Sequence, residues 1–255
     1  MRHVSLSFLA LAGLTSVAPA SANSEVTDKS AKPNIVIITT DQQSYNTISA
    51  LAALNKESSF YSTPNIDRLV KSGTAFNLTY CANPVSVPSR FSLYTGKYGG
   101  QYSIRENLCT GATGEVVRPV LAENGMGNVF VRGGYEAVYA GKVHLPFAGK
   151  DTDSKFTAPD AYGFQEYLTK DEREGLGKVS AEFIRNRKPG DKPFLYVANF
   201  LNPHDICLEG STNISDEIKG SNKKPEIVAT VKMMRERAAK IPEGKFYGEL
   251  APQLP

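Results

Sequence analysis

The feature that most limits the fold of this chain is the unbroken apolar run from Ile35 to Ile38, which lies between Pro33 and the polar residues 41–43. A strand with one wet face alternates apolar and polar residues, whereas an unbroken β-branched run is typical of a strand buried on both faces of a parallel sheet. A second such run extends from Phe194 to Phe200. The sequence therefore predicts an α/β fold, with a mostly parallel sheet and helices on both faces.

The residues between these runs predict the connecting elements. Thr63 suits the N-cap of a helix that ends at Gly73, because Pro64 then occupies the first turn. Further strands are predicted at 74–80 and 135–140, further helices at 118–132, 178–187 and 223–240, and a loop at 150–170. Strand, helix and strand in succession follow the βαβ order of a parallel sheet.

The N-terminal residues 1–22 predict a cleaved secretory signal. Arg2 and His3 precede an apolar run from Val4 to Ala18 that is too short to cross a membrane, and Ala20-Ser21-Ala22 provides the small residues of a cleavage site. No later stretch is long and apolar enough to be a transmembrane segment. We therefore expect the domain 23–255 to be soluble and either secreted or periplasmic.

Charge and cysteine content argue against several classes of function. The formal net charge is only +3, and no basic cluster with interleaved aromatic residues is present, so the sequence gives no case for binding nucleic acid. Cys81, Cys109 and Cys207 are an odd number without CxxC spacing. They indicate neither a disulfide scaffold nor a zinc site.

The stretch from Ser86 to Arg90, Ser-Val-Pro-Ser-Arg, suggests a nucleophile beside an anion site. Pro88 is expected to keep Val87 extended and Ser89 to begin a helix, which places Ser86 just before the helix N-terminus. Backbone N–H groups and the helix dipole favour an anion there, and Arg90 adds a positive charge. The alternative is a surface turn followed by a serine-capped helix.

Polar side chains follow each of the predicted strands. Asp41 and Gln42 come after the first, where carboxylate and amide oxygens suit Ca²⁺ or Mg²⁺, although Asp41 could also simply cap a turn. Lys142 and His144 lie on one side of an extended stretch, a pair that suits anion binding and proton transfer. His204 follows the last strand. Because carboxyl ends of parallel strands meet at one edge, where ligands bind, these side chains are predicted to share a site.

The chain resembles the N-terminal part of the type I sulfatases, in the alkaline phosphatase superfamily, from about Pro33 to Asp205. Residues 86–90 with Thr95-Gly96 resemble the family's C/S-x-P-x-R…TG signature. Residues 34–42 resemble its first metal-binding strand, residues 141–144 its GKxH segment, and residues 202–205 its second catalytic histidine segment. The resemblance implies an alkaline phosphatase-like fold and hydrolysis of a sulfate monoester, on an aryl or carbohydrate group.

The resemblance also implies a role for each site residue. Ser86 would be oxidised to formylglycine by a serine-type sulfatase-maturating enzyme, and the hydrate of that aldehyde would attack sulfur. The bound metal would be Ca²⁺, with Mg²⁺ as the alternative, held by Asp41, Gln42 and the side chain of residue 86. Arg90 would support the aldehyde hydrate, and Lys142 would bind the sulfate. His144 would remove a proton, and His204 would assist the leaving oxygen.

Three readings remain open from the sequence. The family's later metal ligands are not found after Asp205, so we expect a catalytic domain truncated at its C-terminus, with impaired sulfatase activity. With an unmodified Ser86 nucleophile, the chain would instead be a phosphoryl-transfer enzyme of the same superfamily. Without turnover, it would be an inactive fragment that binds sulfated glycans.

Overall fold

The structure is a computed structural model of the chain, and it describes residues 32–57, 61–76, 78–147 and 159–207, with a few positions between 229 and 240. The chain divides into two units, Met1–Lys32 and Pro33–Pro255, and the elements described below all belong to the second. The predicted signal at 1–22 lies outside the described residues, as does most of the helix predicted at 223–240.

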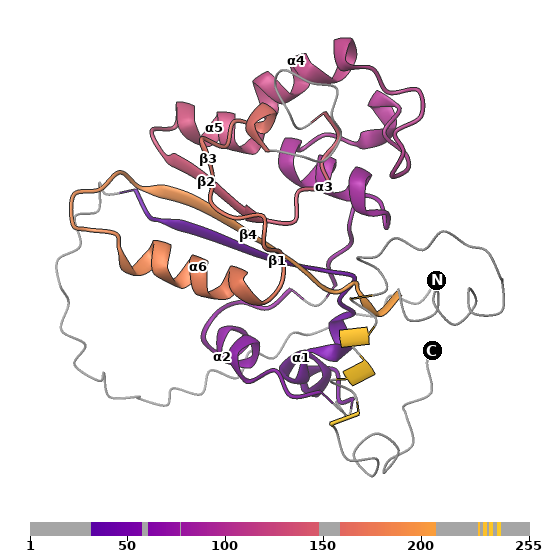
Figure 1. Ribbon diagram of the computed structural model, residues 1–255, viewed down its shortest axis with the longest axis vertical. Coiled ribbons are helices and arrows are strands. Elements are labelled where there is room, and N and C mark those ends of the chain that lie inside the picture. Colours follow the sequence, from indigo (N-terminus) through magenta and orange to yellow (C-terminus); the bar gives the residue numbers. More distant parts are fainter. Residues whose placement is uncertain are drawn as a thin grey trace, which may run out of the picture. The chain divides into compact units, whose positions relative to one another are not determined.

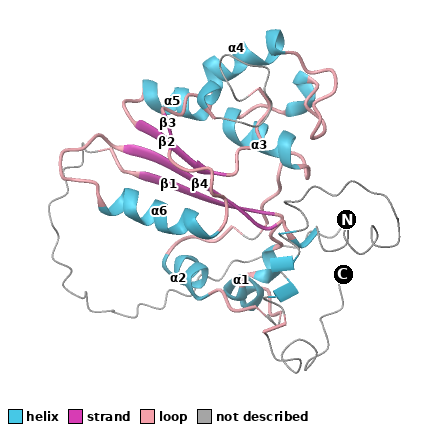
Figure 2. Cartoon of the chain, in the orientation of Figure 1, coloured by secondary structure: helices cyan, strands magenta, loops and turns pink. Residues whose placement is uncertain are grey.

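Between residues 32 and 207, the described part of the chain contains four strands and six α-helices (Figure 2). In chain order the elements are β1 (Ile35–Asp41), α1 (Ser49–Leu54), α2 (Pro64–Ser72), α3 (Ser86–Thr95), α4 (Gly114–Asn124), α5 (Met126–Arg132), β2 (Glu136–Gly141), β3 (Glu166–Tyr167), α6 (Glu174–Arg185) and β4 (Phe194–Pro203). Single 3₁₀ turns lie at Tyr45–Thr47, Gly99–Tyr102 and Asp160–Tyr162. No helix among these has the length and apolar character needed to cross a membrane.

The strands form one sheet in the order β1-β4-β2-β3, and every pair in it is parallel. The strand that is last in sequence, β4, is inserted between β1 and β2, with Val197 opposite both Ile37 and Tyr139. The predicted parallel α/β sheet is therefore confirmed. Because all four strands run the same way, their carboxyl ends lie at one edge.

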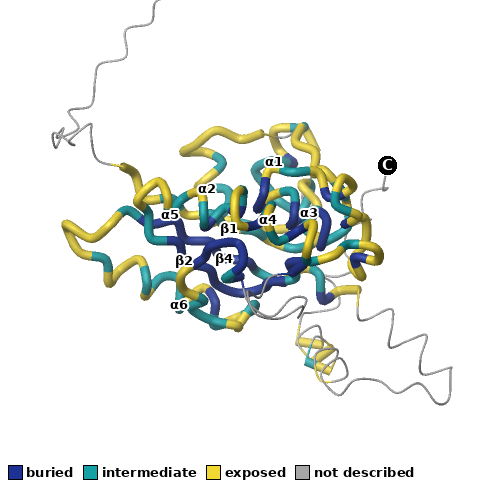
Figure 3. The backbone as a smooth tube through the Cα atoms, turned by 90° about the horizontal axis from the view of Figure 1, so that it is seen from above, coloured by how far each residue is buried: buried dark blue, intermediate teal, exposed yellow. Residues whose placement is uncertain are grey.

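Helices cover both faces of the sheet, as predicted (Figure 1). On one face, Leu195 and Val197 of β4 pack in a core shared with α3, α4 and α5. On the other face, Tyr196 packs in a second core with Leu176 of α6. The central strands β2 and β4 are accordingly the most deeply buried backbone in Figure 3. Successive residues of a strand point to opposite faces, so one apolar run supplies both cores.

The prediction that the first apolar run is buried on both faces is wrong for β1. Its residues alternate in burial, and Val36 and Ile38 are 43% and 60% exposed, whereas Ile35 and Ile37 pack against the first core. Within the described residues, β1 pairs only with β4 and therefore lies at the edge of the sheet. A strand at the edge of a sheet has a neighbouring strand on one side only, so fewer side chains surround it and one of its faces stays exposed.

The strand predicted at 74–80 is also wrong. The described residues of this stretch form no ladder, and Phe76, Leu78 and Tyr80 are 79%, 80% and 87% exposed. Alternating apolar residues favour a strand only where a partner strand and a core are available to them. The connection from β1 to β2 runs instead through the helices α1 to α5.

Smaller differences concern the ends of elements. The helix predicted at 118–132 is divided into α4 and α5 at Gly125, where a Cβ atom would lie 2.7 Å from the carbonyl oxygen of Tyr162. The stretch 150–170, predicted as loop, contains the two-residue strand β3. Helix α6 begins at Glu174, before the predicted start at 178. The helix predicted from Thr63 to Gly73 is confirmed as α2.

The sheet predicts a large difference between two identical substitutions. Leu195→Ala removes a fully buried side chain from the central strand, so we expect the free energy of unfolding to fall by about 2–5 kcal/mol. Leu69→Ala, at a side chain of α2 that is 65% exposed, is the matched control and should change it by about 0.5 kcal/mol or less. Urea unfolding of both variants measures this. Equal losses would contradict the central position of β4.

Candidate active site

Five of the predicted site residues meet at the carboxyl edge of the sheet. Asp41 is the last residue of β1, Lys142 and His144 directly follow β2, and Arg90 and Ser86 come from α3. Their placement follows from the parallel sheet, because each strand releases its next residues at the same edge. They are linked by the hydrogen bonds and ion pairs described next.

The hydroxyl of Ser86 contacts the imidazole of His144. Ser86 Oγ lies 2.9 Å from His144 Nδ1, and which atom donates depends on the histidine tautomer. Burial, followed by the positive charges of Lys142 and Arg90, lowers the pKa of His144 to about 4. The imidazole is therefore neutral near pH 7. A neutral imidazole in contact with a hydroxyl can accept the proton of that hydroxyl.

Two cations enclose the carboxylate of Asp41. Its Oδ2 atom lies 2.6 Å from Lys142 Nζ and 3.1 Å from Arg90 Nη2, and each of the three side chains is only 9–12% exposed. Burial alone would raise the pKa of Asp41, but the hydrogen bonds and charges of Lys142 and Arg90 outweigh it and lower that pKa. The group therefore keeps an excess of one positive charge, which favours an anionic ligand.

Asn199 of β4 joins the elements of the site, and the sequence analysis missed it. Its Oδ1 atom accepts hydrogen bonds from the Tyr94 hydroxyl at 2.6 Å, the Thr39 hydroxyl at 2.7 Å and Arg90 Nη1 at 3.1 Å. The residue is fully buried. The signal that could have revealed it is a single amide in the apolar run 194–200, because a buried amide needs hydrogen-bond partners.

Helix α3 begins earlier than predicted. Ser86 is its first residue, so Val87 is helical rather than extended, and Pro88 lies in the first turn. Proline is tolerated there because the N–H group that it lacks would have no partner within the helix. Ser86 is therefore a helical residue and not the residue before the helix.

The backbone N–H groups of Val85 and Val87, on either side of Ser86, already have partners. Val85 N–H donates to Asn83 Oδ1 at 2.9 Å, and Val87 N–H donates to Asn107 Oδ1 at 3.1 Å. The expectation that open N–H groups of this helix end would bind an anion is therefore wrong for these positions. The two asparagines fix the start of α3, and Lys142 and Arg90 place positive side chains close to it.

His204 and Gln42 lie at the same edge but make fewer contacts with the group. His204 is half-buried after β4, and it is the smallest of the named contributors to the lowered pKa of His144. Gln42 is exposed, with a backbone φ of 63°. The described hydrogen bonds do not connect either side chain to Ser86.

The donor set fits part of a hard-cation site. The carboxylate of Asp41, the amide of Gln42 and the hydroxyl of Ser86 are all oxygen donors, the type that Ca²⁺ and Mg²⁺ prefer. Such ions take about six or more ligands, and in the described part of the chain no three His, Cys, Asp or Glu side chains come together. Asp41 also already pairs with two cations. These residues alone therefore do not complete a metal site.

Fold and site together define a class of protein: a parallel α/β scaffold with a serine hydroxyl against an imidazole, and buried cations, at the carboxyl edge of its sheet. A family model for sulfatases matches residues 33–237. This chain belongs to the sulfatase family, and its fold is that of the alkaline phosphatase superfamily to which sulfatases belong.

Curated relatives and a solved structure agree. The chain is 30% identical to a Δ4,5-hexuronate-2-O-sulfatase of Bacteroides thetaiotaomicron, over 69% of this chain and 35% of that protein. It is 27% identical to an N-acetylglucosamine-6-O-sulfatase of the same organism, over 69% and 32%. A sulfatase crystal structure from that organism shares 26% identity and a TM-score of 0.52, over 71% and 38%. The chain thus spans about a third of the length of these curated relatives.

The role of Asn199 can be tested by a double-mutant cycle with Tyr94. We expect Tyr94→Phe to cost about 1 kcal/mol of stability in the wild-type protein, because a buried hydrogen bond is lost. In an Asn199→Ala background it should cost nothing, since the hydroxyl no longer has this acceptor. Thermal or urea unfolding gives both values.

Tyr167→Phe is the matched control for this cycle, because the Tyr167 hydroxyl donates to the carbonyl oxygen of Gly141 and not to Asn199. Its cost should be the same in both backgrounds. An equal cost of Tyr94→Phe in both backgrounds would show that the amide is not the acceptor on which Tyr94 depends.

Proposed function

We propose that this chain forms the part of a sulfatase that carries the nucleophile and the sulfate-binding groups, and that residue 86 attacks the sulfur of a sulfate monoester. The observation that carries the proposal is the 2.9 Å contact between Ser86 Oγ and the neutral imidazole of His144, beside two buried cations. Membership of the sulfatase family supports the same reaction.

The side chains of the site would divide the work. Lys142 and Arg90 would attract the sulfate oxygens, since the pair exceeds the charge of Asp41 by one. His144 would accept a proton from a hydroxyl of residue 86, and His204 would give a proton to the alcohol oxygen as its bond to sulfur breaks. Asn199 and Tyr94 would hold Arg90 in place without touching the substrate.

Residue 86 itself is proposed to act as formylglycine. A serine-type sulfatase-maturating enzyme would remove two hydrogen atoms from Ser86, and the resulting aldehyde would bind water. The hydrate supplies one hydroxyl for the attack and a second whose deprotonation lets the sulfate leave. An unmodified serine has only one hydroxyl and would remain sulfated.

A divalent cation is part of the proposal, with Ca²⁺ as the first choice and Mg²⁺ as the second. Asp41, Gln42 and residue 86 would hold it through oxygen atoms, and further ligands would come from outside the described residues. When bound, such a cation supplies positive charge to the sulfate oxygens.

The substrate is proposed to be a sulfated carbohydrate, with an aryl sulfate as a convenient analogue. Both curated relatives described above are named for the removal of sulfate from sugars. Together with the predicted signal at 1–22, this favours a secreted or periplasmic protein that meets its substrate outside the cytoplasm.

One observation favours a second candidate, phosphoryl transfer by unmodified Ser86. The hydroxyl is encoded as such, and it already contacts a base that is neutral near pH 7. A serine beside a base can act as a nucleophile without oxidation.

Turnover by the protein from its native host separates these candidates. We expect metal-dependent hydrolysis of an aryl sulfate, reduced at least about a thousandfold by Ser86→Ala, because the nucleophile is lost. Ser92→Ala is the matched control on the same helix, since the Ser92 hydroxyl has no hydrogen-bond partner to lose among the residues that the structure describes. Turnover of aryl phosphate alone would favour the second candidate. A folded protein that hydrolyses neither ester would contradict both.

Calcium binding gives an independent test that does not require turnover. If Asp41 is a ligand, Ca²⁺ at about 100 times its dissociation constant should stabilise the protein by about 2.7 kcal/mol, and EDTA should reverse this. Asp41→Asn should remove the response. The control is Asp67→Asn, at a carboxylate away from the site that accepts hydrogen bonds from the hydroxyls of Ser49 and Thr63. This variant should keep the stabilisation by Ca²⁺. A calcium response that survives in Asp41→Asn would exclude Asp41 as a ligand.

A further inference from the structure

Arg173 lies just before α6 and forms an ion pair with Asp205, the residue that follows His204. Its Nε atom donates to Asp205 Oδ2 at 2.8 Å, and its Nη2 atom donates to Asp205 Oδ1 at 3.2 Å. Two parallel bonds between a guanidinium and a carboxylate fix orientation as well as distance. The Asp205 side chain is only 6% exposed, and its hydrogen bond raises the pKa of Arg173. The ion pair between Arg173 and Asp205 is therefore partly buried and fixed in geometry, unlike an exposed surface pair.

The same two segments are joined a second time through the backbone. Leu201 N–H donates to the carbonyl oxygen of Glu172 at 2.8 Å, and His204 N–H donates back to the carbonyl oxygen of Leu201 at 3.2 Å. The turn that carries His204 is therefore bonded to residues 172–173 on both sides of the histidine. Leu201 makes the contact before His204, and Asp205 makes the contact after it.

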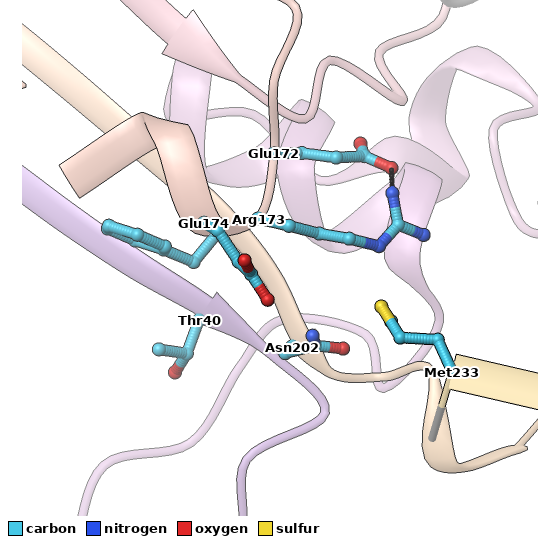
Figure 4. Close-up of a pocket in the computed structure, with 7 residues that line it drawn as sticks. Thr40, Glu172, Arg173, Glu174, Asn202 and Met233 are labelled. Carbon is cyan, nitrogen blue, oxygen red and sulfur yellow. Dashed lines mark hydrogen bonds and ion pairs between the residues drawn. The ribbon is translucent and has the colours of Figure 1, made fainter. Parts of the chain in front are cut away.

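Leu201 and Asp205 on either side of His204 are buried, but the turn also borders an open space. A pocket of about 240 Å³ lies beside the turn, and it is lined by Thr40, Glu172, Arg173, Glu174, Phe200, Asn202 and Met233. Figure 4 shows Arg173 and Asn202 on opposite sides of this space. Where side chains are not in close contact, dispersion forces hold a segment weakly, so on the side of this space the polar bonds contribute most to the position of the turn.

We propose that Arg173 is a positioning residue: through Asp205 it holds the His204 turn so that the imidazole faces the leaving oxygen. The inference rests on the proposed function, in which His204 is the proton donor. Without Arg173, Asp205 would be a buried carboxylate without its main partner, and an uncompensated buried charge is strongly destabilising. We therefore expect the turn to move until Asp205 reaches water. His204 is the adjacent residue and would move with it. A displacement of about 1 Å at a reacting group can cost about a hundredfold in rate.

Kinetics of Arg173→Ala test this for the native-host protein. We expect kcat for an aryl sulfate to fall about a hundredfold with little change in KM, because the sulfate-binding Lys142 and Arg90 are untouched. Added guanidinium should restore part of kcat, whereas methylammonium, which lacks the planar fork, should not. Arg187→Ala is the matched control: Arg187 pairs with Glu136 at 2.7 Å at the amino end of the sheet, so its loss should leave kcat unchanged.

A measurement that does not depend on turnover tests the role of Arg173 separately from the proposed function. Besides His3 in the predicted signal, the chain has only His144 and His204, so its imidazole NMR spectrum is simple. Arg173→Ala should shift and broaden the His204 signals, assigned with His204→Gln, and leave those of His144 in place. Arg187→Ala should move neither. Unchanged His204 signals would overturn the inference whatever the activity. Absence of turnover in the wild-type protein would instead reject the proposed function, and the His204 signals would still decide the role of Arg173.

Discussion

The site depends on the buried carboxylate of Asp41 between Lys142 and Arg90. These ion pairs link the end of β1 to the segment after β2 and to the first turns of α3. Removing one partner of a buried pair commonly costs about 3–5 kcal/mol, because it leaves an uncompensated charge. Asn199 adds β4 to the same set by accepting a bond from Arg90. Three strands and one helix are thereby held together at the point where the proposed reaction takes place.

This arrangement gives Ser86, the proposed nucleophile, a fixed position. Ser86 begins a helix, and the N–H groups of Val85 and Val87 beside it donate to Asn83 and Asn107. The side of α3 that follows is buried in the core. A reacting group on such a rigid element needs little reorganisation before the chemical step. The proposed proton donor is different, because His204 lies on a turn held by Arg173 and Asp205 across a pocket. The sulfur of the reacting ester would thus meet residue 86 on a rigid helix. The leaving oxygen would meet His204, whose turn is held by an ion pair.

Much of this could be predicted from the sequence. The apolar runs before Asp41 and His204 predicted parallel strands, and the parallel sheet brought Asp41, Lys142, His144 and Ser86 together as expected. The exposure of one face of β1 could not be predicted, since it depends on which strands become neighbours. Asn199 carries no spacing motif, and its role depends on donors from two other elements, β1 and α3. The early start of α3 was missed because a proline suits both the first turn of a helix and an extended stretch.

The central claim is that residue 86 is the nucleophile in an oxidised form, and peptide mass spectrometry of the native-host protein tests it most directly. Cleavage after Lys71 and Arg90 releases the peptide from Ser72 to Arg90, which contains position 86. The account predicts a peptide two hydrogen atoms lighter than the encoded one, with the loss localised by fragmentation to residue 86. An unmodified Ser86 in protein that hydrolyses a sulfate ester would contradict it.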